Sequence, residues 1–217
     1  QWLGPFDQIT LSKAPFFPMF LGAIHTVSLP LRIAEFLLYL ALPIIALRVV
    51  APLRLAPGKV LFLASVFFLF ITVLNNELRQ GRGVKFGFNL ILFLLSLFSI
   101  IVRGRNGTTT SVMCWSGLAG FAFGLASITR EEASWLLLPA AVAFAGFFLA
   151  DVSRRKVGQL ILISMVAWLS YSVPVQSVSL VNEMAYGIDG PSLRQNESFR
   201  KLYSMLSSLE PSTQKRF

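Results

Sequence analysis

The residues with the clearest chemical potential form a charged turn between two apolar stretches, Arg130-Glu131-Glu132. A guanidinium group carries planar, paired donors that match the oxygens of a phosphate. Arg130 is therefore a candidate for holding a lipid phosphate at a membrane surface, with Glu131 or Glu132 orienting it or contacting a polar substrate. The same turn would also suit a solvated helical hairpin, in which Thr129 and Glu132 stand at the spacing of a capping box.

Two polar residues near the beginning of the chain are candidates for the same chemistry. Asp7 is a candidate catalytic carboxylate, although an aspartate in a surface loop more often forms a turn. Lys13 is a candidate contact to lipid phosphate, or else an anchor that holds a surface helix among the head groups. His25, the only histidine, has no Cys, Asp or Glu close to it in the sequence, so the pattern indicates no metal site.

The composition around these residues is that of a membrane protein. Of 217 residues, 55% are apolar and 13% are charged, with a mean hydropathy of +0.68. A soluble domain carries about a quarter charged residues. The deficit excludes a soluble globular enzyme, a disordered chain and a secreted disulfide scaffold. The net charge of the chain is +9. In a multi-pass protein such an excess usually reflects Lys and Arg in the cytoplasmic loops, so it does not indicate a nucleic-acid partner.

Six apolar stretches reach or approach the roughly 17–25 residues that a helix needs to cross the hydrocarbon core. Because a spanning segment must satisfy its own backbone hydrogen bonds, each stretch is predicted to be a helix. They are Ile33–Val50, Lys59–Asn76, Phe86–Val102, Ser111–Thr129, Ala133–Ala150 and Val157–Pro174. The loops between them are short, so neighbouring helices should be antiparallel. The sequence thus predicts an all-α integral membrane protein.

The segments on either side of this six-helix bundle (33–176) have a different character. Residues 1–32 are predicted to be an extracytoplasmic loop, in which Pro15–Ile24 suits a short interfacial helix. Residues 177–217 are polar and form a predicted extracytoplasmic tail. Within the tail, apolar residues at helical spacing between Asn196 and Glu210 predict an amphipathic helix.

One predicted helix, Ser111–Thr129, carries a packing signal. Gly120 and Gly124 stand at the spacing of a GxxxG motif, which lets helix backbones approach closely in membranes. We expect this helix to pack tightly against a neighbour. The motif is common by chance in apolar helices, so it implies no ligand.

The interiors of the predicted helices contain almost no ionisable residues. Glu35 lies near one end of its helix, where it can pair with Arg32. Proton- or ion-coupled transport usually needs charged side chains at mid-membrane depth, where they are costly and therefore functional. Their absence argues against transport and places any chemistry at a membrane surface.

The basic residues of alternate loops predict the orientation of the bundle. One set of loops holds eight of them: Arg48, Arg54, Lys59, Arg103, Arg105, Arg154, Arg155 and Lys156. The other set holds four: Arg79, Arg82, Lys85 and Arg130. The first set should be cytoplasmic, which places the Arg130 turn, residues 1–32 and the tail outside. The predicted location is the bacterial cytoplasmic (inner) membrane.

Two stretches resemble motifs of a known class of membrane proteins. The first, Leu11-Ser-Lys-Ala-Pro-Phe-Phe-Pro-Met-Phe-Leu, resembles the K-x-P-x-[YF]-P-x-F-L surface helix of polytopic bacterial GT-C-class glycosyltransferase-like proteins. The second, Gly124-Leu-Ala-Ser-Ile-Thr-Arg-Glu-Glu, is similar to their G-L-x-x-x-T-R-x-E turn. The resemblance covers roughly residues 1–150. Ala14 and Phe16 depart from the Gly and the Gly or Tyr that are more usual at their positions.

This resemblance implies a polyprenyl-phosphate-linked sugar donor and an inverting transfer to an acceptor hydroxyl. It assigns lipid-phosphate binding to Arg130 and carries Glu131 over to the hairpin. A divalent metal could offset the phosphate charge. In such proteins the main catalytic carboxylate lies further upstream, and Asp7 is the only acid left in the first segment. The chain, which opens on Gln1, is accordingly expected to be a piece of a longer protein.

Three classes of function remain open at this point. The first is a membrane glycosyltransferase whose partners are membrane lipid and a polyprenyl-phosphate sugar. The second is a non-catalytic integral membrane subunit that packs within a larger complex. The third, a transporter or channel subunit, is the least compatible with uncharged helix interiors.

Cysteine labelling tests the predicted orientation. In intact cells, we expect an impermeant thiol reagent to modify the variant Gly81→Cys but not Ser153→Cys, because the two positions should face opposite sides of the membrane. The reverse pattern would overturn the assignment.

Overall fold

The computed structural model describes residues 16–62, 65, 81–106, 108–149, 154–187, 190, 201 and 205, and the regular structure among them is entirely helical. The α-helices are α2 (Phe16–Thr26), α3 (Leu31–Val50), α5 (Gly81–Asn106), α6 (Thr109–Ser127), α7 (Leu137–Leu149) and α8 (Arg154–Tyr186). There are also two 3-10 helices, η1 (Ala51–Leu53) and η2 (Glu131–Leu136), and residues 57–62 are helical as well.

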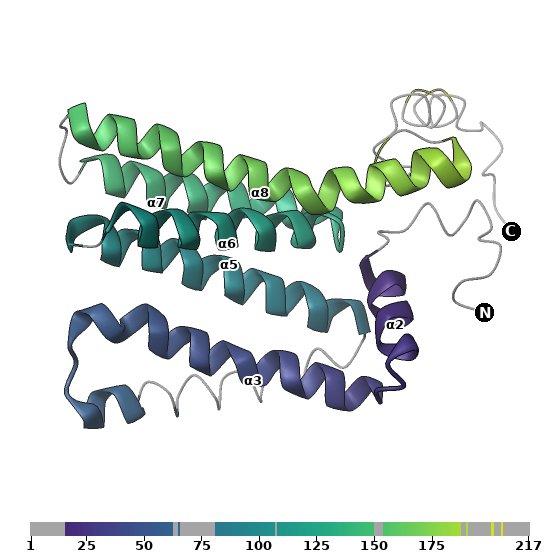
Figure 1. The fold of residues 1–217 in the computed structure, drawn as a ribbon, viewed down its shortest axis with the longest axis horizontal. Coiled ribbons are helices and arrows are strands. Elements are labelled where there is room, and N and C mark those ends of the chain that lie inside the picture. Colours follow the sequence, from purple (N-terminus) through teal and green to yellow (C-terminus); the bar gives the residue numbers. More distant parts are fainter. Residues whose placement is uncertain are drawn as a thin grey trace, which may run out of the picture.

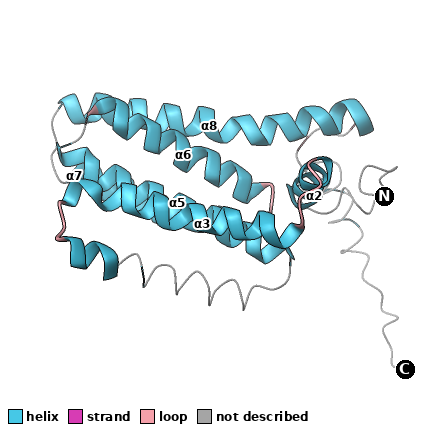
Figure 2. Cartoon of the chain, turned by 60° about the horizontal axis from the view of Figure 1, so that its bottom comes forward, coloured by secondary structure: helices cyan, strands magenta, loops and turns pink. Residues whose placement is uncertain are grey.

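The long helices run side by side as one bundle (Figure 1). Helix α6 is central, because it packs against α5 on one side and against α8 on the other. Helix α3 lies on the far side of α5, and α7 packs against α5 and η2. Helix α2 lies across one end of the bundle (Figures 1 and 2).

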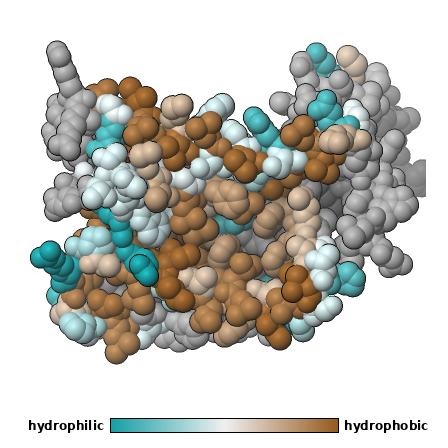
Figure 3. Space-filling view, viewed as in Figure 1, coloured by the Kyte–Doolittle hydropathy of each residue, from teal (hydrophilic) through white to brown (hydrophobic). Residues whose placement is uncertain are grey.

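Four helical segments of the described residues are long and apolar enough to cross a membrane: Leu31–Leu53, Phe86–Gly104, Thr109–Ser127 and Val157–Met184. Apolar side chains also form a broad band over the outside of the bundle (Figure 3). An outward-facing apolar band of this kind is stable only in a hydrocarbon solvent. The chain is therefore an all-helical integral membrane protein, as its composition predicts.

The six predicted spans are not all confirmed. Helix α7 is described over 13 residues, and the 3-10 helix η2 leads directly into it. The described part of α7 ends at Leu149, so the predicted span Ala133–Ala150 is not confirmed. Most of the predicted span Lys59–Asn76 lies outside the described residues.

The predictions for the two terminal helices are tested only in part. Helix α2 occupies the place where the sequence predicts a short helix, and its position across the end of the bundle is compatible with a membrane surface (Figure 1). Its interfacial location stays a prediction. Of the predicted amphipathic helix between Asn196 and Glu210, only Lys201 and Met205 are described, and both are helical. The division into loop, bundle and tail is likewise a prediction.

The tightest helix contact joins α6 to α8. A Cβ atom added to Gly120 would lie 2.0 Å from the carbonyl oxygen of Ala167, and one added to Gly124 would lie 2.7 Å from that of Tyr171. The Ser116 hydroxyl donates a hydrogen bond of 2.6 Å to the carbonyl of Ile163 across the same interface. The close packing predicted from the glycine spacing is confirmed, and its partner is α8.

A second contact joins three helices at the opposite end of the bundle from α2. The Arg103 guanidinium on α5 donates to the carbonyls of Arg48 (2.6 Å) and Val49 (3.3 Å) at the end of α3, and also to the Ser99 hydroxyl. It lies 5.0 Å from the centre of the Trp115 ring on α6. The last carbonyls of a helix have no partner within it, so Arg103 supplies donors to two carbonyls at the end of α3.

Substitution of Gly120 tests the α6–α8 contact. We expect Gly120→Ala to lower the Tm of the purified protein in detergent by several degrees, because overpacking costs about 1–3 kcal/mol. Gly146→Ala is the matched control: nothing lies within 4 Å of its added Cβ, and alanine favours a helix by up to about 1 kcal/mol. Equal Tm values for Gly120→Ala and wild type would contradict the backbone contact.

Substitution of Arg103 tests the second contact. We expect Arg103→Met to destabilise the protein by about 1.5–3 kcal/mol, the range for hydrogen bonds to charged groups, as measured by thermal unfolding in detergent. Arg48→Ala should have a much smaller effect, since only the backbone carbonyl of Arg48 accepts from Arg103. If Arg103→Met and Arg48→Ala lowered the stability equally, the positive charge at this end of the bundle would account for the effect, and the carbonyl contacts would be contradicted.

Candidate functional site

Arg130 projects from the turn between α6 and η2. Its backbone N–H donates to the carbonyl of Ala126 at 2.9 Å, and its own carbonyl accepts from the N–H of Ala133 at 3.2 Å. The side chain is exposed, and its guanidinium carbon lies 5.6 Å from the centre of the Phe86 ring on α5. The turn and the ring therefore hold the guanidinium at the end of the bundle, on its exposed surface.

The predicted capping box at this turn is wrong. The N-cap of η2 is Arg130, and it makes no side-chain capping bond. The Thr129 side chain is buried, and its hydroxyl donates to the carbonyl of Leu125 at 2.5 Å. Thr129 lies two residues after the end of α6, where the unsatisfied helix groups are carbonyls, so its hydroxyl donates back to the last turn of α6.

The structure brings only some of the predicted site residues together. Glu131 and Glu132 are the first residues of η2 and adjoin Arg130 along the backbone. Asp7 and Lys13 lie outside the described residues. The start of α2 does reach this turn, since the N–H of Phe16 donates to the carbonyl of Ile128 at 3.3 Å. Helix α2 and the Arg130 turn therefore lie at the same end of the bundle.

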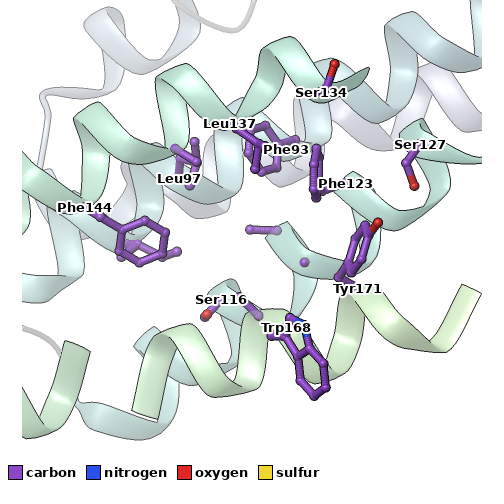
Figure 4. A pocket seen from close by; sticks show the side chains of 15 residues that line it. Phe93, Leu97, Ser116, Phe123, Ser127, Ser134, Leu137, Phe144, Trp168 and Tyr171 are labelled. Carbon is purple, nitrogen blue, oxygen red and sulfur yellow. The ribbon is translucent and has the colours of Figure 1, made fainter. Parts of the chain in front are cut away.

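A cavity of about 510 Å³ lies among α5, α6, α7 and α8, within the size range of ligand pockets (Figure 4). Its walls are mainly apolar. The lining residues are Phe93, Leu97, Ile100, Ser116, Ala119, Gly120, Phe123, Ser127, Ser134, Leu137, Ala140, Phe144, Ala167, Trp168 and Tyr171. Ser127 and Ser134 stand three residues before and four residues after Arg130, so this end of the cavity adjoins the charged turn.

Aromatic rings form one wall of the cavity. The ring centre of Phe123 on α6 lies 5.7 Å from that of Phe93 on α5 and 5.1 Å from that of Tyr171 on α8. Figure 4 shows Ser127 and Tyr171 together at one end and Leu97 with Phe144 at the other. The cavity therefore has the hydroxyl groups of Ser127 and Tyr171 toward the Arg130 turn and mainly hydrocarbon at its opposite end, where the Ser116 hydroxyl is bonded to the Ile163 carbonyl.

The cavity opens on the side of α7 and α8. Its back wall is buried, because the α5 and α6 residues Leu97 and Ala119 are almost inaccessible. At the rim, Leu137 on α7 is 57% exposed and Trp168 on α8 is 63% exposed. Helix α7 packs chiefly on α5 and η2, whereas α8 packs chiefly on α6, so these two helices touch little. The opening thus faces the lipid that surrounds the spans.

The described residues supply no donor set for a metal ion. No three His, Cys, Asp or Glu residues among them lie close enough together to bind one. A divalent metal, which the motif resemblance allows, therefore has no ligands in the described part of the chain.

Comparisons with protein-family models, with curated proteins and with solved structures find no match to this chain. The resemblance of residues 1–150 to GT-C-class proteins accordingly rests on the two motifs alone. The site itself combines an exposed arginine, an adjoining apolar cavity and an opening toward lipid.

Proposed function

We propose that this chain binds a polyprenyl-phosphate-linked sugar and serves in the transfer of that sugar at the extracytoplasmic face of the membrane. The lipid phosphate binds Arg130, and the isoprenoid chain occupies the cavity. The observation that carries the proposal is the adjacency of the two parts. An apolar cavity open to lipid ends at Ser127 and Ser134, on either side of an exposed arginine.

The chemistry of Arg130 favours a phosphate ligand. A guanidinium can donate two parallel hydrogen bonds to phosphate oxygens, and basic groups at the ends of transmembrane helices bind lipid head groups in this way. The Phe86 ring beneath the guanidinium keeps the group at the bundle end without neutralising its charge. A phosphate at the membrane surface can approach the guanidinium from outside.

The cavity favours a single hydrocarbon chain. Because its opening faces lipid, a ligand enters the cavity from the hydrocarbon of the bilayer, which is itself apolar. Moving a chain from lipid into the cavity yields little hydrophobic free energy, because both surroundings are hydrocarbon. It does replace empty space by van der Waals contact along the walls. Most of the affinity must therefore come from the head group at Arg130.

In the proposed reaction, the acceptor hydroxyl oxygen attacks the anomeric carbon of the sugar while the bond from that carbon to the lipid phosphate breaks. A carboxylate takes the proton of the hydroxyl, and the lipid phosphate leaves as a polyprenyl phosphate. Arg130 stabilises the negative charge on the departing phosphate. Glu131 and Glu132 are the nearest carboxylates along the chain, and Asp7 is the third candidate for the base.

The orientation of the bundle supports the outer face. Helix α6 is 19 residues long, about 28 Å, so its two ends are one hydrocarbon thickness apart. Arg48 and Arg103 meet at the end where most loop arginines and lysines are found, which the positive-inside rule makes cytoplasmic. Arg130 lies at the opposite end.

Substitution of Arg130 tests the proposal. We expect Arg130→Ala to weaken binding of polyprenyl phosphate about 10- to 100-fold, since a hydrogen bond to a charged group contributes about 1.5–3 kcal/mol. Sugar transfer from the corresponding lipid-linked donor should be abolished. Arg130→Lys should be intermediate, because lysine keeps the charge without the fork. Binding is measured by native mass spectrometry or by displacement of a labelled lipid.

Arg48→Ala is the matched control, because it removes an exposed guanidinium from the opposite end of the bundle. We expect it to leave binding unchanged. Equal affinity of wild type and Arg130→Ala would remove the phosphate site. Normal lipid binding without any sugar transfer would favour the alternative function, a non-catalytic membrane subunit.

A further inference from the structure

Asn89 on α5 is a buried polar residue that the site described so far does not use. Its side chain is 1% exposed, and neither its amide oxygen nor its amide nitrogen has a hydrogen-bond partner among the described residues. Such a group has lost its hydrogen bonds to water and has gained none from the protein, which is rare in native structures. It therefore needs a hydrogen-bond partner from elsewhere. Polar side chains that face the interior of a membrane bundle commonly mark the path of a ligand.

Other polar side chains near this end of the bundle are already satisfied by their own helices. The Ser96 hydroxyl donates to the carbonyl of Leu92 at 2.7 Å, and the Ser127 hydroxyl donates to that of Gly124 at 2.7 Å. An asparagine carries two donors and a carbonyl acceptor, and its short side chain cannot satisfy all of them in a helix interior. Asn89 is thus a buried polar group that can still bond to a ligand.

The position of Asn89 relates it to the proposed lipid site. It follows Phe86 by three residues and precedes Phe93 by four, so the three residues share one face of α5. Phe86 lies under the Arg130 guanidinium, and Phe93 lines the cavity. At 1.5 Å per residue, Asn89 is about 4.5 Å along the helix axis from Phe86 and about 6 Å from Phe93. Asn89 is not itself a lining residue of the cavity, but it stands one turn of α5 from Phe93, which is, and one turn from Phe86 beneath Arg130.

We propose that Asn89 binds the oxygen atoms at the junction of a lipid chain and its phosphate. This inference rests on the proposed function and names a further part of the same site. With the phosphate at Arg130 and the chain in the cavity, the ester oxygen of the ligand passes the level of Asn89. The amide N–H donates to this oxygen or to a phosphate oxygen. An acyl or isoprenoid chain without an oxygen at this depth leaves the amide unsatisfied, so Asn89 selects phosphate-headed chains.

The variant Asn89→Leu separates this role from a structural one. Leucine has a similar volume and no polar atoms, so it removes the unsatisfied amide. We expect the ligand-free protein to have a Tm equal to or above that of wild type, while the Kd for polyprenyl phosphate rises at least fivefold. The two effects have opposite directions, and only a ligand contact produces both. Ser96→Ala, a buried polar change on the same helix, should leave the Kd unchanged.

Two results would overturn the inference. A Kd unchanged by Asn89→Leu, in a protein that binds polyprenyl phosphate and loses it on Arg130→Ala, would show that the amide does not touch the ligand. A lower Tm of ligand-free Asn89→Leu would show that the amide has a partner within the protein. A wild-type protein that binds no polyprenyl phosphate would refute the proposed function, and the inference with it.

Competition by phosphatidic acid distinguishes the two sources of a phosphate-headed chain. We expect phosphatidic acid to displace labelled polyprenyl phosphate poorly, because its two acyl chains compete for one cavity of about 510 Å³. Equal competition, with the same loss in Asn89→Leu, would support the Asn89 contact and assign the site to bilayer phospholipid, against the isoprenoid donor.

Discussion

The contact between the backbones of α6 and α8 is the constraint on which the rest of the bundle depends. Lipid tails are as apolar as helix surfaces, so helices in a bilayer associate through van der Waals contact and hydrogen bonds. Because Gly120 and Gly124 lack side chains, the α8 backbone at Ala167 and Tyr171 lies directly against α6. The Ser116 hydroxyl adds a hydrogen bond to the α8 backbone. This contact positions α8, and everything that α8 contributes to the cavity, relative to α6.

The cavity results from a difference in how closely helices pack. Phe123, next to Gly124, stacks on Tyr171 and faces Phe93, so the tight α6–α8 contact also builds the aromatic wall. Helix α7 has no comparable contact with α8, since it packs chiefly against α5 and η2. Its start is displaced by the 3-10 helix that follows Arg130. A void that a fully packed bundle would fill is therefore left open toward lipid.

The two arginines at opposite ends of the bundle have different roles because their backbone surroundings differ. Arg103 meets the last carbonyls of α3, which have no other partner, and it is used to satisfy them. At the Arg130 end, the carbonyls of Gly124 and Ala126 accept from the N–H groups of the turn itself. These carbonyls are therefore satisfied by backbone donors, and Arg130 is exposed at this end of the bundle. The amide of Asn89 on α5 is satisfied neither by an arginine nor by the backbone of the turn.

The sequence by itself determined that the chain is an all-helical membrane protein, because apolar segments in lipid must satisfy their backbone hydrogen bonds internally. It also determined that Arg130 lies at a helix end and that Gly120 lies in a close contact. Only the tertiary structure decided which helix meets Gly120, that Thr129 donates back to α6, and that Phe93 becomes a cavity wall while similar phenylalanines face lipid. Asn89 carried a sequence signal, because it is the single amide in its apolar stretch. Its lack of a partner depends on the helices that pack against α5. These outcomes depend on distances between segments remote in the chain, and local spacing contains no information about them.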